Sequence, residues 1–467
     1  MLEIRRVSRH QGRCDASRDA PGRRRLPGLK SSPRSVRTFL LIAPYFAPQA
    51  AVGAYRWVKL ARKLVPRGYR PAVLCATFPE DTRDPELLRA LPPEVVTHDA
   101  YLDRRILAAR DGLTALEQRL RGPAPAKKGP ARPIEGLNPF RDLGDRCLLH
   151  GPHAAREAVA LGRREGARAV VVSAGPFSCL PVGVHAARRL GLPLVLDFRD
   201  PWGLHESGAT PPQGAAERGR HHVVATLEHH ILTRADHVVL NTRRALAAYQ
   251  ERYPFLAGKS SFVRNHYDAS LYDPAPTSPE PPTRFTILHT GTLRAETRVD
   301  DIGQALRRII DRENLTPADL VLRQIGRATE YERAEVARLG LSGFVEFAPP
   351  IPQRALLGEL RRAHVLLSMV DPRVVLRIAA KTYDYIASGM PIVSITKNSE
   401  VDELLAHRPD NKRIRPGDVD ALVASLAAHF EQFRATRALP SPVPAPSEFS
   451  SETAADRFAA VFERVMR

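Results

Sequence analysis

The sequence has few of the residues that would indicate a disulfide-bonded or metal-bound scaffold. Its 467 residues include four cysteines, which are widely spaced and form neither a Cys-x-x-Cys pair nor a Cys/His cluster. Neither a disulfide framework nor a zinc site is therefore expected. No apolar run reaches the roughly 18 residues that cross a bilayer, and the basic N-terminus lacks the apolar segment of a secretory signal. We therefore expect a cytoplasmic protein.

Positive charge is plentiful but unevenly placed. Lys and Arg number 70 against 51 Asp and Glu, which gives a net charge of +19. Residues 1–37 carry ten Arg and one Lys against three acids, so that +8 of the total lies there. The excess indicates anionic partners such as nucleotide phosphates. The rest of the chain has only a modest excess and no helix-turn-helix, zinc or RNA-stacking motif, so nucleic acid is not an expected partner.

The chain divides into segments of different composition. Residues 1–36 are rich in Arg, Ser, Gly and Pro, which predicts a disordered basic tail. Beyond them, short apolar runs alternate with helical patterns, which is typical of an open parallel sheet with helices on both faces. Five prolines in 273–283 predict a stiff linker. We therefore expect an α/β protein with two doubly wound Rossmann-like domains, 37–272 and 284–440, and a C-terminal segment with a helix, 441–467.

The expected strands are short runs of aliphatic residues. They lie at 38–43, 71–76, 169–173, 193–197, 237–241, 284–289, 320–325, 345–347, 364–368 and 391–395. Helices are expected over 55–65, 300–311 and 452–466, and over much of 101–165 around a loop at 122–133. Because ligands bind beyond the carboxyl ends of parallel strands, the loops that follow these strands are the places to look for a site.

Two of these loops could approach an anion. Small residues surround Gly53 before a helix, where backbone N–H groups could approach a phosphate, although a tight turn is the better explanation of this pattern alone. The second loop, Thr290-Gly291-Thr292-Leu293-Arg294, is followed by Arg298. Two arginines spaced by four residues could face one diphosphate, or could simply be solvated.

Two further segments place charge at a strand end or a helix start. Asp197-Phe198-Arg199-Asp200-Pro201-Trp202 follows an expected strand, and a buried structural ion pair is its alternative explanation. The segment from Lys381 to Ile392 reads Lys-Thr-Tyr-Asp-Tyr-Ile-Ala-Ser-Gly-Met-Pro-Ile. It predicts a helix that begins at Lys381, where phosphate also prefers to bind, and ends at Gly389.

Together these segments resemble the family 4 glycosyltransferases, which have the GT-B architecture of two Rossmann-like domains facing each other across a cleft. The resemblance covers residues 38–467. It implies that 37–272 is the acceptor domain, that 284–440 is the nucleotide-sugar donor domain, and that the final helix crosses back to the N-terminal domain. Its strongest part is the segment from Lys381 to Ile392, which looks like the family's nucleotide-sugar helix. The segment Asp197–Trp202 is similar to one in divergent members that act on bacterial surface polysaccharides.

The resemblance implies a function and a set of site residues. The reaction would transfer a sugar from a nucleoside diphosphate sugar to a glycan or lipid-linked acceptor, with retained configuration. No metal ion or other cofactor is expected, since cationic side chains would take the metal's role. The implied donor-binding residues are Gly53, Thr290, Gly291, Gly326, Lys381, Thr382 and Asp384. The candidate catalytic residues are Asp197, Asp200, Arg294 and Arg298, and the acceptor-side candidates are Arg56, Arg199 and Trp202.

One position departs from the family pattern. The family often has two Glu separated by seven residues, of which the first touches the donor sugar and the second the ribose. Asp384 occupies the second place, while Leu376 occupies the first. A sugar-nucleotide-binding scaffold without turnover is therefore an alternative, as is an epimerase or hydrolase on the same fold.

Two further patterns have alternative explanations. Arg56, Lys59, Lys63 and Arg67 lie at helical spacing beside Trp57. This basic stripe suggests peripheral docking on the anionic inner face of the cell membrane, and a solvated helix face is the alternative. The four histidines at 221, 222, 229 and 230 are better explained as solvated helix residues than as metal ligands.

Overall fold

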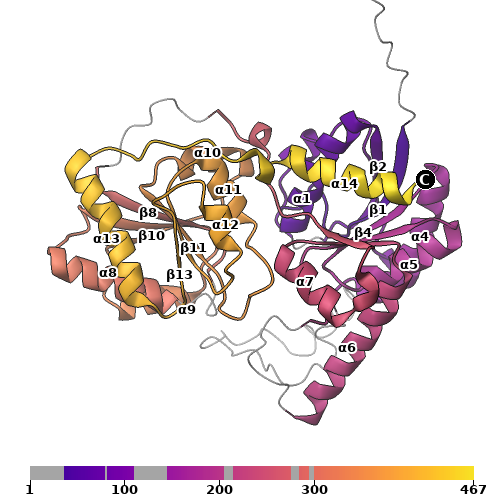
Figure 1. Ribbon diagram of the computed structural model, residues 1–467, viewed down its shortest axis with the longest axis horizontal. Coiled ribbons are helices and arrows are strands. Elements are labelled where there is room, and N and C mark those ends of the chain that lie inside the picture. The colour runs from indigo at the N-terminus through magenta and orange to yellow at the C-terminus, as the bar shows by residue number, and fades with distance from the viewer. Residues whose placement is uncertain (1–35, 79–80, 110–144, 205–213, 275–282, 294–298) are drawn as a thin grey trace, which may run out of the picture. The chain divides into compact units, whose positions relative to one another are not determined.

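The computed structural model describes residues 36–78, 81–109, 145–204, 214–274, 283–293 and 299–467. Within these ranges the chain forms two parallel β-sheets with helices packed on them (Figure 1). The expected N-terminal tail and the loop at 122–133 lie outside the described residues, as does most of the linker.

The first sheet has seven parallel strands in the order β3-β2-β1-β4-β5-β6-β7. The strands are β1 (Arg37–Ile42), β2 (Tyr69–Cys75), β3 (Val96–Asp99), β4 (Val170–Ala174), β5 (Leu194–Phe198), β6 (His237–Leu240) and β7 (Ser260–Phe262). The strand order reverses between β1 and β4, which is where ligands bind in doubly wound sheets.

Alternating side chains of β1 show why this sheet is covered on both faces. Leu40 and Ile42 belong to one core cluster, and Phe39 and Leu41 belong to another, all with no exposed surface. The first core is covered by α4 (Gly151–Arg164), α5 (Cys179–Leu190), α6 (Ala215–Arg234) and α7 (Arg243–Arg252), and the second by α1 (Val52–Leu64) and α14 (Ser451–Val465). The continuous apolar runs are therefore strands buried on both sides.

The last helix of the chain packs on the first sheet. Phe458 and Phe462 of α14 lie 5.2 Å from the ring of Trp57 and 4.8 Å from that of Phe39. Figure 1 shows α14 beside α1 at the end of the chain. Truncating any one of these four buried aromatic rings would cost several kcal/mol of stability. Their packing attaches the C-terminal segment to residues more than 390 positions earlier in the chain.

The second sheet has six parallel strands in the order β10-β9-β8-β11-β12-β13. They are β8 (Phe285–Thr290), β9 (Leu320–Ile325), β10 (Val345–Ala348), β11 (Val365–Met369), β12 (Ile392–Ile395) and β13 (Lys412–Ile414). One face is covered by α8 (Val299–Glu313), α9 (Glu330–Arg338) and α13 (Val419–Thr436), the other by α10 (Gln353–Leu360), α11 (Lys381–Ser388) and α12 (Val401–Leu405). The order reverses between β8 and β11.

These two sheets confirm the expected pair of doubly wound Rossmann-like folds, and the ten expected strands are present within two residues of their predicted ends. Three strands were not expected: β3, β7 and β13. All three are edge strands of three or four residues, and they carry too little apolar pattern to be recognised. A short helix, α2 (Glu86–Arg89), completes the helices named here. Among the described residues, no helix combines the length and apolarity needed to span a membrane.

Candidate functional site

The carboxyl edge of the second sheet carries a paired lysine and histidine. Lys381 begins α11, and its Nζ lies 2.6 Å from Nε2 of His289 on β8. Burial lowers the pKa of Lys381 to about 7. Burial, together with the nearby lysine charge, holds the pKa of His289 well below its usual range. The histidine is therefore neutral near pH 7, and the pair carries at most one positive charge.

A glycine-rich turn continues this network. Nδ1 of His289 bonds to Oε1 of Gln324 at the end of β9, and Nε2 of Gln324 donates to the carbonyl oxygen of Gly291 at 2.6 Å. A Cβ on Gly326 would lie 2.1 Å from that same oxygen, and the φ of Gly326 is +139°. Glycine at 326 is therefore required for the two loops to approach this closely.

The neighbouring residues of α11 fix the end of β8. The backbone N–H of Thr290 donates to the hydroxyl of Tyr385 at 2.9 Å, and that hydroxyl donates to the carbonyl of Leu367 at 3.2 Å. Thr382, an expected donor-binding residue, is 1% exposed. Gly389 ends the helix with a φ of +72°, as its sequence predicts.

Asp384 lies in the same helix but is already engaged. Its Oδ1 accepts from the hydroxyl of Tyr272 at 2.6 Å, from Nε2 of Gln353 at 3.2 Å and from Nζ of Lys59 at 3.4 Å. The side chain is 13% exposed. A ribose would therefore have to bind the second carboxylate oxygen or displace one of these donors.

At the carboxyl edge of the first sheet, Asp197 forms a buried ion pair. Its carboxylate accepts from Nη2 and Nε of Arg56 at 2.8 and 3.0 Å, and from Nε1 of Trp57 at 3.0 Å. Arg56 also donates to the carbonyls of Val263 and Arg264, both at 2.9 Å. Asp197 is 0% exposed and Arg56 is 2% exposed. This geometry favours a structural role for both residues over the expected contacts with an acceptor.

Arg199 is a second buried cation at this edge. Its guanidinium donates from Nε to Ala174 at 3.1 Å and from Nη2 to Gly175. It lies against the first turn of α1, because a Cβ on Gly53 would be 2.6 Å from Nη1. Glycine at 53 therefore makes room for a side chain of this protein, whether or not its amide also meets a ligand.

Asp200 is the more accessible of the two candidate acids. Its Oδ1 lies 3.3 Å from Nη1 of Arg377, and the two side chains are 41% and 40% exposed. The ring of Trp202 stacks on Phe177, with centroids 5.4 Å apart and an angle of 13° between the planes. Asp200 thus retains the access to solvent that an acceptor hydroxyl would need.

Leu376 adjoins the first sheet. Its side chain packs on the core cluster that contains Phe198, and its carbonyl accepts from the hydroxyl of Thr242, the N-cap of α7. The position where the resemblance places an acid therefore holds an apolar contact with the first sheet.

The expected exposed basic stripe on α1 is wrong. Arg56 is buried as described, and Lys59 is 5% exposed and donates to the carbonyl of His266. Two residues of α14 pair with the other two basic side chains: Glu452 with Lys63 and Asp456 with Arg67, both at 2.7 Å. The stripe contacts the rest of the protein and is not the exposed face that its spacing suggested; peripheral membrane association stays a prediction.

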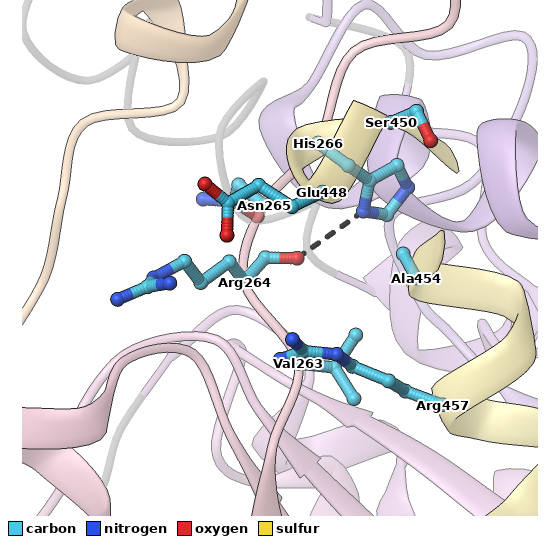
Figure 2. Close-up of a pocket in the computed structure, with 8 residues that line it drawn as sticks. All are labelled: Val263, Arg264, Asn265, His266, Glu448, Ser450, Ala454 and Arg457. Carbon is cyan, nitrogen blue, oxygen red and sulfur yellow. Dashed lines mark hydrogen bonds between the residues drawn. The ribbon is translucent and has the colours of Figure 1, made fainter. Parts of the chain in front are cut away.

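A small cavity lies between the segment after β7 and α14 (Figure 2). His266 and Arg457 are among its lining residues, and its volume is about 10 Å³. Nδ1 of His266 donates to the carbonyl of Arg264 at 3.2 Å, as Figure 2 shows, while Nε2 has no hydrogen-bond partner among the residues that the structure describes. Such a volume holds about one water molecule and no nucleotide.

The comparisons with known proteins identify the fold. No family model matches the chain, and no curated protein matches it by sequence. Among solved structures, sucrose-phosphate synthase from Thermosynechococcus elongatus matches with a TM-score of 0.59 and 14% identity, over 92% of this chain and 96% of that chain. HepE from Anabaena, in complex with UDP-glucose, matches with a TM-score of 0.58 and 14% identity, over 91% and 99%. The chain has the GT-B fold.

Another match shows what this likeness leaves open. A chain assigned as a UDP-N-acetylglucosamine 2-epimerase from Listeria monocytogenes matches with a TM-score of 0.53 and 12% identity, over 92% of this chain and 96% of that one. Proteins assigned different chemistries therefore share this architecture. At such identities the GT-B fold is established, while the activity must be argued from the residues.

Some expected site residues cannot be placed, and others were missed. Arg294 and Arg298 lie outside the described residues. In the described part of the chain, no group of three or more His, Cys, Asp or Glu side chains is arranged to hold a metal ion; independence from metal stays a prediction. His289, Gln324 and Tyr385 were not expected at the site. A histidine that ends an expected apolar strand, two residues before a glycine, was the available signal.

Proposed function

We propose that this protein is a glycosyltransferase that transfers a sugar from a nucleoside diphosphate sugar to a hydroxyl of a glycan or lipid-linked acceptor. The observation that carries the proposal is Lys381 at the start of α11, beside the glycine turn after β8. A cation, a helix N-terminus and a close backbone turn meet where the strand order reverses, which is where a diphosphate binds in such sheets. Retention of configuration and a role in surface polysaccharides are supported by the two sequence segments that resemble family 4.

Sugar transfer from such a donor depends mainly on stabilisation of the diphosphate leaving group. As the bond between sugar and phosphate breaks, negative charge grows on the diphosphate, and fixed donors lower the barrier. Lys381 is the described candidate for this role, and Arg294 and Arg298 are further candidates. Asp384 would hold the ribose, and Asp200 would bind or deprotonate the acceptor hydroxyl. No nucleophile is assigned, because transfer on one face of the sugar needs none.

A donor screen tests the proposal. Thermal unfolding is measured with UDP, GDP and ADP, and turnover is then measured with the matching sugar nucleotides. We expect one nucleotide to raise the unfolding midpoint, and the Lys381→Met variant to lose most of that shift. If none of the three nucleotides changes the unfolding midpoint of the wild-type protein, the proposed donor site is wrong.

A binding scaffold without turnover is the second candidate, favoured by the apolar contact of Leu376 with the first sheet. It predicts binding of a sugar nucleotide with neither hydrolysis nor transfer to any acceptor. Chromatographic separation followed by mass spectrometry distinguishes these possibilities, because an epimerase would return an isomeric donor of the same mass and a hydrolase would release free sugar.

A further inference from the structure

His289 lies at the centre of a linear chain of hydrogen bonds at the second sheet. Lys381 Nζ contacts Nε2 of the imidazole, Nδ1 contacts Oε1 of Gln324, and Nε2 of Gln324 donates to the carbonyl of Gly291. The amide group fixes the direction of this chain. Since its nitrogen donates to a carbonyl, its oxygen must accept, so Nδ1 of the imidazole carries the proton.

The tautomer has a consequence for the lysine. With the proton on Nδ1, Nε2 of His289 is an acceptor, and its partner must be an N–H of Lys381. Since His289 is 1% exposed, water does not compete for this lone pair. One proton of an ammonium group is thus used by His289, and two remain for a ligand.

We propose that His289 is a positioning residue for the donor diphosphate: it holds Lys381 at the glycine turn, and binding of the diphosphate fixes a proton on the lysine. The inference rests on the proposed function, because it names the regulation of the same site by pH. A Cβ on Gly291 would lie 3.6 Å from Nζ, so the lysine lies directly at the turn where a phosphate would approach.

The groups around Lys381 support proton uptake. His289 is the titratable group in hydrogen-bond contact with Nζ among the described residues. Tyr385 of the same helix bonds to Thr290 and to a β11 carbonyl, and burial raises its pKa to about 12, so it stays neutral. Asp384 is bonded to other donors. Burial lowers the pKa of Lys381 to about 7, and a bound diphosphate would raise it again.

The protonation state of Lys381 in the free protein determines how the affinity for the diphosphate changes with pH. Below pH 7 the free protein already holds the proton, so little is taken up on binding. At pH 7.5 about 0.8 proton should be taken up, and at pH 6.5 about 0.2, for a group that titrates near 7 and is fully charged when bound. Affinity should therefore fall as the pH rises through 7. A sugar nucleotide is a suitable probe, because both of its phosphates titrate far below this range.

Calorimetry in buffers of different ionisation enthalpy measures the proton number, using the donor that the screen identifies. His289→Gln keeps an acceptor near Nζ and should keep both the affinity, within about threefold, and the proton uptake. His289→Leu removes the acceptor, which should lower the lysine pKa by about one unit. Affinity should then fall about eightfold at pH 7.5 and less than twofold at pH 5.5, while proton uptake at pH 7.5 rises towards one. A merely structural role would weaken binding equally at both pH values, and that result would overturn the proposal.

A second measurement needs no donor. Competitive acetylation of the intact protein, followed by peptide mass spectrometry, reports the titration of Lys381 itself. The midpoint should lie near pH 7 in the wild type and about one unit lower in His289→Leu. Equal midpoints would refute the role of His289 even if the donor binds. If no sugar nucleotide binds while the midpoints differ as expected, the proposed function is wrong, but the effect of His289 on the titration of Lys381 is supported.

Discussion

The buried pair of Arg56 and Asp197 leads to a prediction that separates structure from catalysis. Asp197→Asn keeps the shape of the side chain but replaces a carboxylate with an amide, whose NH₂ group takes the place of an oxygen that accepts from Arg56. Removing one partner of a buried ion pair costs about 3–5 kcal/mol. Because Arg56 keeps two carbonyl partners, we expect about 3 kcal/mol, and a fall in the unfolding midpoint of roughly 5–10 °C.

Asp200→Asn is the matched control. It makes the same chemical change three residues later, where the ion pair with Arg377 is exposed, and exposed pairs contribute less than about 1 kcal/mol. Stability should hardly change, while transfer should fall about a hundredfold if Asp200 serves the acceptor. Thermal unfolding and transfer rates are measured on both variants, the rates well below the midpoint of the weaker one.

The opposite pattern would contradict this reasoning. If Asp197→Asn unfolds at the wild-type midpoint and has lost transfer, Asp197 is a catalytic residue, which is one of the two roles that the sequence suggested for it. A double variant, Arg56→Met with Asp197→Leu, adds a further check. Removing both charges should recover part of the lost stability, because no buried charge is left without its partner.

Three further predictions concern close approaches and one buried carboxylate. Gly53→Ala should lower the free energy of chemical unfolding by about 1–3 kcal/mol, because the new Cβ at position 53 would lie 2.6 Å from the guanidinium of Arg199. The loss should be smaller when Arg199→Ala is also present. Gly326→Ala should lower stability by at least as much and weaken binding of the donor in calorimetry, because the carbonyl of Gly291 must move. Glu400→Gln should cost about 1–3 kcal/mol in the same unfolding assay, since this 5% exposed carboxylate accepts from a buried guanidinium and from two amides of α7. Unchanged stability in Gly326→Ala or Glu400→Gln would show that these contacts contribute little.

The sequence predicted the centre of each sheet well and its edges poorly. Central strands such as β4 are continuous apolar runs, because both of their faces are covered, and such runs are recognisable without any partner. The edge strand β3 reads Val-Thr-His-Asp, and its side chains alternate between half-buried and exposed. Its pairing with β2 depends on a neighbour more than 20 residues away, which no local pattern records.

Site residues were harder to predict, because a charge on a helix is ordinarily solvated. Arg56 and Lys59 lie on α1 at a spacing typical of an exposed basic face. Their partners, Asp197 and Asp384, lie 141 and 325 residues further along the chain. Only the fold brings these acids to the helix, so the same spacing that suggested a membrane surface in fact marks a buried contact.

The two sheets have the same strand order up to the last strand, yet their cations differ in what they can still bind. At the first sheet, Arg199 has donors fixed on the carbonyls of Ala174 and Gly175, which commits much of its guanidinium to the protein. At the second sheet, the neutral imidazole of His289 is the hydrogen-bond partner of Lys381 among the described residues, so within them an ammonium keeps two protons for a ligand. A phosphate therefore gains more hydrogen bonds from the second sheet, where its charge also offsets the burial that disfavours charge on the lysine. The same burial makes the lysine sensitive to pH, so tight binding of the donor and its proton dependence have one physical cause.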